Sequence, residues 1–438
     1  PPPRVQAADG IRDKQIGLVG SEMCIRDSYT IAWPAEEHSS AREIRCSPLY
    51  ETLQNKGACF GEKMGWERPN WFAPEGIEPR DIYSFERPNW FEHVGNEHRA
   101  VRERVAVIDQ TSFAKFEVRG PDAATALNRI CAADVDCAPM QVRYSQMLNS
   151  RGGIECDLTV TRLAADHYYL ITGTGFVTHD RHWIESHFGR NESVALEDVS
   201  DRYSVLSLMG PESRAVLGVV CADAACLDSF PFGSARNIRI AGCDLTALRV
   251  TYVGELGWEL HCRQQDAESI YQALMEAGQG AGIADAGYRA IESLRLEKAY
   301  RAWGSDLTPD HTPLQAGLGF AVKLRSSIDF NGRDALVEQS RKPLTKRMMV
   351  FSVEEGEINL IGRETIYRNG ERVGWLTSGG YGYTLGHPVG MGYVRNPSGV
   401  TSEWLDSGTY ELEVATRRVS ARLHYRGLYD PDMTRVRS

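Results

Sequence analysis

The stretch from Tyr144 to Leu163 constrains the fold of this chain more than any other part of its sequence. Its residue types predict two β-strands, 144–148 and 154–163, which are joined by Asn149-Ser-Arg-Gly-Gly153. Two adjacent glycines in that turn allow the backbone to reverse direction through positive φ angles, which residues with a Cβ atom adopt only with strain. The stretch therefore predicts a β-hairpin.

The second predicted strand alternates apolar and polar residues, which places the two kinds on opposite faces. Ile154, Cys156, Leu158 and Val160 share one face, whereas Asp157 lies on the other. A carboxylate just after a tight turn can be aimed into a cleft by the rigid hairpin. The pattern by itself favours the alternative, which is a solvated aspartate at the edge of a sheet.

The same stretch also resembles a known family. The run Tyr-Ser-x-Met-Leu-Asn-x-x-Gly-Gly-Ile-x-x-Asp-Leu-x-Val, residues 144–160, is similar to the folate-site hairpin of the aminomethyltransferase (glycine cleavage T-protein) family. This resemblance implies that Asp157 is the family's essential aspartate and that Tyr144 either contacts folate or orients the carboxylate. It also implies a folate contact for Asn149, although asparagine is a preferred turn residue in any case.

A second motif, Tyr252-Val-Gly-Glu-Leu-Gly-Trp-Glu259, resembles the family's Tyr-Thr-Gly-Glu-x-Gly-x-Glu. The resemblance implies that Glu259 clamps the pterin ring of folate. A carboxylate that faces two adjacent N–H donors is suited to that role. Taken without the family, Glu259 is interpreted as an exposed strand residue.

A third motif, Leu294-Arg-Leu-Glu-Lys-Ala-Tyr-Arg-Ala-Trp303, resembles dimethylglycine dehydrogenases more than free-standing T-proteins. It implies a folate contact for Arg295 and a pocket wall formed by Trp303, for which plain core packing is the alternative. A salt bridge on the surface of a helix is the simpler explanation for Glu292, Arg295 and Glu297.

Two other features carry less weight. Ile291 stands where the family has an arginine, and Arg289, two positions earlier, is a candidate substitute. His179, His182 and His187 have a spacing that puts two imidazoles near one helical face, but no accompanying carboxylate motif supports a metal ion. We therefore predict no metal site.

Composition excludes several classes of protein. The 49 basic and 59 acidic side chains give a net charge of −10, which opposes binding to nucleic acid or to an acidic membrane surface. No window approaches the ~18 consecutive apolar residues of a spanning helix. Ten cysteines are scattered without a Cys-x-x-Cys pair. This usage favours free thiols in a reducing compartment, the cytoplasm or, in a eukaryote, the mitochondrial matrix.

The segment from Ser47 to Phe72 resembles the junction between the flavin and folate halves of dimethylglycine and sarcosine dehydrogenases. The resemblance implies that an FAD-dependent domain precedes this chain and that FAD is bound there, because no dinucleotide-binding glycine fingerprint occurs here. Glu67-Arg-Pro-Asn-Trp-Phe72 recurs as Glu86-Arg-Pro-Asn-Trp-Phe91, and these X-Pro and Trp residues predict an extended strap over another surface.

The predicted strands and helices intermix without a regular βαβ alternation, which indicates an α+β fold. Short strands with frequent turns near the C-terminus predict a small β-barrel, and the family resemblance implies the same. Its expected strands are 348–353, 364–368, 372–377, 390–394, 410–414 and 418–423. Upstream, a hairpin is predicted from strands 248–253 and 258–262. The expected division is a non-native or disordered leader (1–28), a junction (29–95), a T-protein-like folate-binding domain (96–340) and the barrel (341–438).

Together, the resemblances imply the tetrahydrofolate-binding half of an FAD-dependent N-methyl amine dehydrogenase. Such a protein would capture an iminium one-carbon unit as 5,10-methylenetetrahydrofolate, and its partners would be folate and an N-methylated amine. Two alternatives remain open: a free-standing aminomethyltransferase or folate-dependent demethylase, and a non-catalytic folate-binding module.

Overall fold

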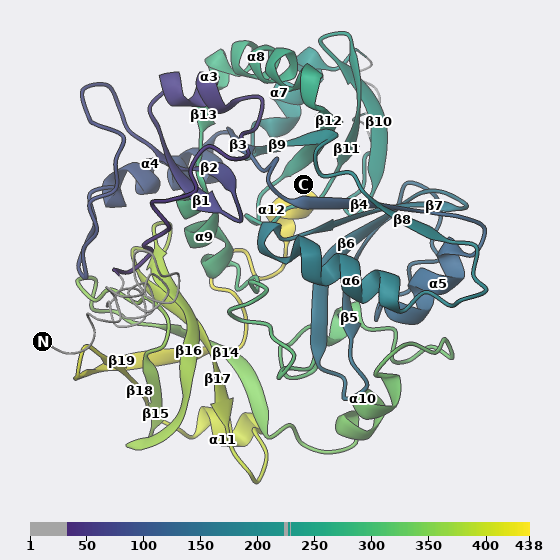
Figure 1. The fold of residues 1–438 in the computed structure, drawn as a ribbon. Coiled ribbons are helices and arrows are strands. Elements are labelled where there is room, and N and C mark those ends of the chain that lie inside the picture. The colour runs from purple at the N-terminus through teal and green to yellow at the C-terminus, as the bar shows by residue number, and fades with distance from the viewer. Residues whose placement is uncertain (1–32, 223–226, 228) are drawn as a thin grey trace, which may run out of the picture. The chain divides into compact units, whose positions relative to one another are not determined.

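The computed structural model describes residues 33–222, 227 and 229–438 (Figure 1). The predicted leader, residues 1–28, lies outside the described part. Among these, residues 33–36 and 83–88 belong to one unit, and residues 37–82 with 89–438 belong to the other. The second unit contains both large sheets and the barrel.

A six-stranded sheet forms the first layer of this unit, with the strand order β10-β11-β12-β9-β3-β13. Helices α3 (Tyr50–Asn55), α7 (Ser213–Val220) and α8 (Ala267–Ala277) contribute to the apolar core on one face of this sheet. That core includes the fully buried Trp258. The strands are β3 (Ala106–Asp109), β9 (Tyr203–Met209), β10 (Ala235–Ile240), β11 (Cys243–Leu248), β12 (Gly257–Arg263) and β13 (Ala284–Asp285).

A five-stranded sheet forms the second layer, with the order β5-β6-β7-β4-β8. Its outer face packs against α5 (Ala123–Ile130) and α6 (Val177–Ser186), whose side chains join those of Phe116, Leu158 and Leu170 in a second core. The strands are β4 (Ala114–Arg119), β5 (Val142–Leu148), β6 (Ile154–Ala164), β7 (His167–Thr172) and β8 (Ala195–Asp198).

The two sheets are built on the same plan. The series β4, α5, β7, η2 (Thr174–Phe176), α6 corresponds to β9, α7, β12, η4 (Gln264–Asp266), α8. Each helix α5 and α7 follows a glycine with positive φ, Gly120 at 137° and Gly210 at 130°. A Cβ atom at Gly120 would lie 2.1 Å from the carbonyl oxygen of Ser193, so only glycine fits.

The helix-free faces of the two sheets pack against each other. Tyr169 and Ile171 of β7 share a small apolar cluster with Ala235 of β10 and Leu248 of β11. Helices therefore lie on the outer faces, and the space between the sheets is lined by strand residues from both.

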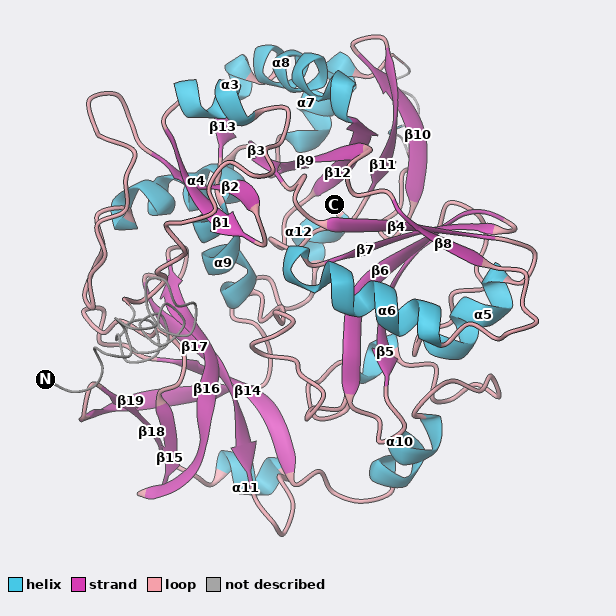
Figure 2. Ribbon diagram, viewed as in Figure 1, coloured by secondary structure: helices cyan, strands magenta, loops and turns pink. Residues whose placement is uncertain are grey.

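The C-terminal region is a closed barrel with the order β14-β17-β16-β15-β18-β19, which confirms the predicted barrel (Figures 1 and 2). It is preceded by helix α10 (Arg333–Ser340), and α11 (Ser402–Asp406) lies between β17 and β18. Thr401 caps α11 by accepting the Trp404 N–H. The strands are β14 (Lys346–Ser352), β15 (Thr365–Arg368), β16 (Glu371–Gly382), β17 (His387–Arg395), β18 (Tyr410–Val414) and β19 (Arg417–His424).

Several expectations for the chain before the barrel were wrong. No extended strap forms in residues 58–72, because β1 (Ala58–Lys63) and β2 (Trp66–Phe72) pair as a hairpin in which Trp71 is fully buried. The repeated hexapeptide adopts two conformations: its first copy lies in β2, and its second leads into α4 (Phe91–Glu103). Identical local sequence is thus overridden by different tertiary surroundings.

The hairpin predicted from residues 248–253 and 258–262 was also misplaced. The pairing strands are β10, β11 and β12, and residues 249–253 form an irregular connection. Alternation of charged and apolar residues in 235–248 was the signal that this prediction overlooked. The remaining elements are α9 (Tyr288–Glu297), η5 (Gln279–Ala281), η6 (Gly319–Ala321) and α12 (Thr434–Arg437). Among the described residues, no helix is both long and apolar enough to span a bilayer.

Candidate functional site

The predicted hairpin is present as β5 and β6, and it places Gln146 directly opposite Asp157. Gly152 has a φ of 78°, so the turn uses the glycine conformation that the sequence predicted. Asn149 serves this turn: its Oδ1 accepts the backbone N–H groups of Arg151 at 2.9 Å and Gly153 at 3.0 Å. Its Nδ2 also donates to Glu155 Oε1 of β6 at 2.8 Å, so the side chain of Asn149 holds the turn and the start of the second strand.

Asp157 points from β6 into the space between the sheets and is half-buried. Its Oδ1 accepts a hydrogen bond from Gln146 Nε2 at 3.0 Å. Burial raises the pKa of Asp157 to about 6, while hydrogen bonds from Gln146 and Tyr144 act in the opposite direction. The pKa of the Tyr144 phenol is raised well above its usual value by burial and by the neighbouring Asp157 carboxylate.

Glu259 reaches the same space from the other sheet. It lies opposite Leu248 of β11 and Ser207 of β9, on the face that packs against β7. Its Oε2 is 3.6 Å from Nε2 of His261, whose pKa is lowered by burial. Asp157 and Glu259 are far apart in the sequence. Asp157 therefore lies on the inner face of one sheet, and Glu259 lies on the inner face of the other.

Arg295 is a buried residue of α9 and not a surface one. It is 1% exposed, and Glu297 is fully buried. The Arg295 guanidinium donates to Asp306 Oδ2 at 2.8 Å and to Ser378 Oγ of β16 at 2.9 Å, and it also pairs with Glu292. The expected ion pair between Glu292 and Arg295 is therefore present, but the expectation of a surface position was wrong for Arg295 and Glu297, because α9 packs against α4, β2 and the barrel strands β16 and β17.

Trp303 and Arg289 have different surroundings. The Trp303 ring lies 5.4 Å from the Phe176 ring, and its buried Nε1 has no hydrogen-bond partner among the described residues. Arg289 forms an ion pair with Asp81 at 2.5 Å and lies over the Trp90 ring. These contacts of Arg289 are with Asp81 and Trp90 and not with the β5–β6 hairpin.

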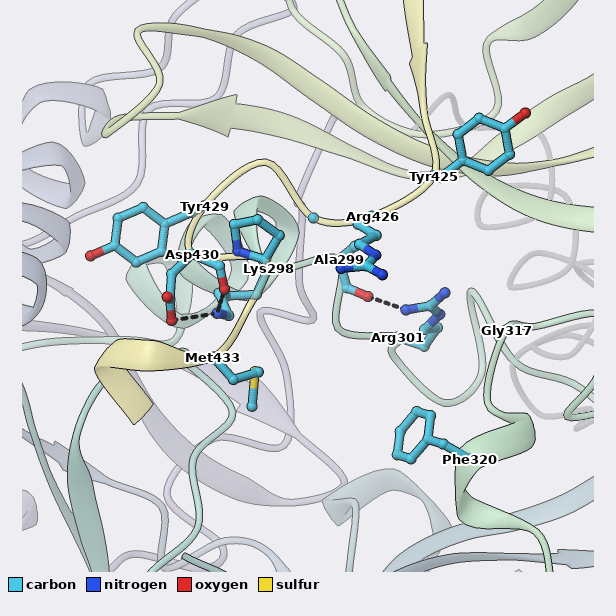
Figure 3. Close-up of a pocket in the computed structure, with 12 residues that line it drawn as sticks. Lys298, Ala299, Arg301, Gly317, Phe320, Tyr425, Arg426, Tyr429, Asp430 and Met433 are labelled. Carbon is cyan, nitrogen blue, oxygen red and sulfur yellow. Dashed lines mark hydrogen bonds and ion pairs between the residues drawn. The ribbon is translucent and has the colours of Figure 1, made fainter. Parts of the chain in front are cut away.

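A cavity of about 310 Å³ is lined by Lys298, Ala299 and Arg301, by Gly317 and Phe320, and by residues of the segment 425–433 after the barrel strands (Figure 3). Arg301 and Phe320 lie on one side of it, and the Phe320 ring stacks 6.4 Å from that of Tyr144. Phe320 is 80% exposed, and Tyr252 donates its hydroxyl to the Arg301 carbonyl at 2.9 Å. The described lining residues do not include Asp157 or Glu259, and the cavity is linked to Asp157 only indirectly, through Phe320 and Tyr144.

A second cavity of about 540 Å³ shares Arg301, Gly317 and Tyr425 with the first and extends toward the start of the barrel. Its lining includes Arg347, so both cavities carry positive charge. No sequence motif marked Phe320 or Tyr425, because these residues come from separate segments that only the tertiary structure brings together.

The structure also gathers Cys156, His179 and Asp180, whose potential ligand atoms lie within 4.8 Å of one another. This group differs from the histidine spacing that was considered and rejected from the sequence, His179 with His182 and His187. Asp180 accepts hydrogen bonds from Thr172 at 2.5 Å and interacts with His179 Nδ1 at 2.9 Å. These contacts within the protein account for the cluster without a further ligand.

Comparison with known proteins agrees with this architecture. The GCVT N-terminal domain model matches residues 49–326, and the glycine cleavage T-protein C-terminal barrel domain model matches residues 346–430. The crystal structure of glycine cleavage system aminomethyltransferase T from Bartonella henselae has a TM-score of 0.75 and 26% identity. It covers 89% of this chain and 99% of its own length.

Two dehydrogenases are similar in sequence. The mitochondrial sarcosine dehydrogenase of Mus musculus is 36% identical over 94% of this chain and 49% of its own length. The mitochondrial dimethylglycine dehydrogenase of the same organism is 37% identical over 85% of this chain and 44% of its own length. This chain thus spans about half the length of these relatives. From its family-model matches and its fold, the chain belongs to the glycine cleavage T-protein family of aminomethyltransferase-like, folate-binding proteins.

Proposed function

We propose that this chain is the tetrahydrofolate-binding part of an enzyme that oxidises an N-methylated amine. In this proposal it transfers the resulting one-carbon unit to tetrahydrofolate, forming 5,10-methylenetetrahydrofolate. The names of the two dehydrogenase relatives favour a small N-methyl amine as the ultimate substrate. Oxidation by FAD would belong to a region beyond the half of these relatives that this chain spans.

The observation that supports the proposal most is the pKa of the Asp157 carboxyl group, which burial raises to about 6. A group that titrates close to neutral pH can both take up and release a proton during turnover. Tyr144 lies beside Asp157, and Glu259 enters from the opposing sheet, so acceptors for N–H groups of a pterin stand on two sides. Arg301 and Arg347 line the adjoining cavities, where they can receive the carboxylates of the folate tail.

The proposed reaction balances without an additional reagent. The iminium R₂N⁺=CH₂ and the two N–H groups of tetrahydrofolate give methylenetetrahydrofolate and R₂NH₂⁺. Two C–N bonds form to the folate nitrogens, the C–N bond to the amine breaks, and both protons end on the released amine. Asp157 is assigned the proton transfer between folate and amine. In this proposal the iminium must be kept from water, which would hydrolyse it to formaldehyde.

The proposal is tested with the full chain, formaldehyde, a secondary amine and tetrahydrofolate. We expect methylenetetrahydrofolate to form faster than in the protein-free mixture, and we expect Asp157→Asn to reduce the excess rate by roughly 10²- to 10⁴-fold. Saturating tetrahydrofolate should raise the melting temperature of both proteins, since it binds the native state. Absence of any thermal shift in the parent protein would remove the folate site from consideration.

A second candidate function is supported by the structural match, which covers 99% of the length of an aminomethyltransferase. In that case the chain would accept an aminomethyl group from a carrier and not an iminium from an oxidase. The two candidates differ in donor: a reaction that proceeds only with an aminomethylated carrier, and not with formaldehyde and a secondary amine, favours the transferase. If the chain binds folate but transfers a one-carbon unit from neither donor, the result indicates a non-catalytic folate-binding module.

A further inference from the structure

Gln146 is the cross-strand partner of Asp157, and no motif or comparison assigns it a role. Its side chain is fully buried, and its Nε2 donates to Asp157 Oδ1 at 3.0 Å. Directly opposite residues in an antiparallel pair project from the same face, so this contact follows from the register of the hairpin. A change in register of one residue would remove it.

The other end of the same amide has no partner. Gln146 Oε1 is buried and accepts no hydrogen bond from the described residues. A buried acceptor without a donor destabilises a folded protein, and methionine has a similar length without that penalty. Stability of the fold alone therefore does not account for a glutamine at this position. The contact with Asp157 is the favourable interaction that remains.

Other charged or titratable groups also act on Asp157. The Asp180 carboxylate of α6 opposes ionisation of Asp157, and Tyr144 of β5 supports it through a hydrogen bond. Tyr252, in the connection before β12, is influenced by the Asp157 charge as well. Of the two hydrogen-bond donors to Asp157, Tyr144 also borders the cavity through Phe320, whereas Gln146 is enclosed in the sheet.

We propose that Gln146 is a positioning residue, whose amide holds the Asp157 carboxylate in the orientation that receives a proton from folate. The role of Gln146 in proton transfer rests on the proposed function. Its effect on the Asp157 pKa does not, because a hydrogen-bond donor to the carboxylate favours the ionised form whether or not folate is bound. The side chain acts through Asp157 and is not assigned any contact with substrate.

The test is Gln146→Met in the full chain, with Gln339→Met as the matched control. Gln339 lies in α10, where it accepts a hydrogen bond from Thr312. Loss of one hydrogen bond to a charged group should move the acid limb of the pH–rate profile upward by about one to two pH units. The rate at pH 7 should fall several-fold, while the melting temperature of Gln146→Met stays unchanged or rises. Gln339→Met should leave the pH profile in place.

A measurement independent of activity separates this inference from the proposed function. In protein labelled with ¹³C at aspartate Cγ, the Asp157 signal is identified by its absence in Asp157→Asn, and its titration is followed in both backgrounds. An upward shift in Gln146→Met supports the positioning role even if the parent protein transfers no one-carbon unit. An unchanged titration midpoint overturns it, even if the parent protein is active.

Discussion

Tyr169 of β7 and His261 of β12 are hydrogen-bonded, with the phenol oxygen 3.2 Å from the imidazole Nδ1. Their rings meet edge to face at 90°. Because the two residues lie on different sheets, this buried contact joins the sheet that carries Asp157 to the sheet that carries Glu259. Together with the apolar cluster between the sheets, it helps to fix the relative position of the two carboxylates.

Tyr169→Phe should therefore lower stability by about 1 kcal/mol, since it removes one buried hydrogen bond and leaves the imidazole nitrogen unpaired. Tetrahydrofolate affinity should fall with it, by less than tenfold. Calorimetric melting and a folate titration measure the two effects. Tyr168→Phe is the control: the Tyr168 hydroxyl is buried on the opposite face without a hydrogen-bond partner among the described residues, so its removal should be neutral or stabilising. Equal losses in both variants would contradict a specific inter-sheet role.

Glu259→Gln should weaken tetrahydrofolate binding by roughly ten- to a hundredfold, the loss expected when a charged acceptor of substrate N–H groups becomes a neutral amide. The rate at saturating folate should change less than the affinity, because Glu259 is assigned to binding and not to proton transfer. Isothermal titration and steady-state kinetics separate these quantities. Glu371→Gln, on an exposed position of the barrel, should alter neither. A Glu259 variant with parental affinity would exclude the pterin contact.

Glu117 of β4 should make the protein sensitive to acid. Its pKa is lowered to about 2, chiefly by a hydrogen bond from His167 and then by Arg119, against the effect of burial. A carboxylate with a depressed native pKa stabilises the fold above its unfolded pKa of about 4.3, and that contribution is lost as pH falls toward 2. The melting temperature of Glu117→Gln should thus lie below that of the parent at pH 6, and the difference should shrink as pH is lowered from 4.5. A difference that is constant with pH would contradict this assignment.

Arg295→Met should be strongly destabilising, by about 3–5 kcal/mol, because it leaves the buried Asp306 carboxylate without its cation. The barrel should detach first, since Arg295 also donates to Ser378 of β16. Limited proteolysis followed by mass spectrometry would detect cleavage between residues 340 and 346. As a control, Arg417→Met removes an ion pair with Glu355 in which both side chains are more than half exposed, and it should change the melting temperature little.

Local sequence was a good guide where a segment's structure depends on its own residues. The turn Asn149–Gly153 needs a positive φ, and the strand Tyr410–Val414 alternates clearly enough to be bounded correctly. The closed barrel likewise followed from short strands separated by turns. In the site, the same local logic placed Asp157 on the polar face of a hairpin strand.

Tertiary structure decided the features that depend on distant partners. The two copies of one hexapeptide differ because β2 pairs with β1, whereas the second copy leads into a helix. Arg295 looked like a surface residue until the barrel covered it, and Gln146 gained its partner only from strand register. Burial and hydrogen bonding between segments far apart in the chain leave no periodic trace in either segment. The sequence alone therefore determined which residues could face the site, and packing of the two sheets determined which of them meet.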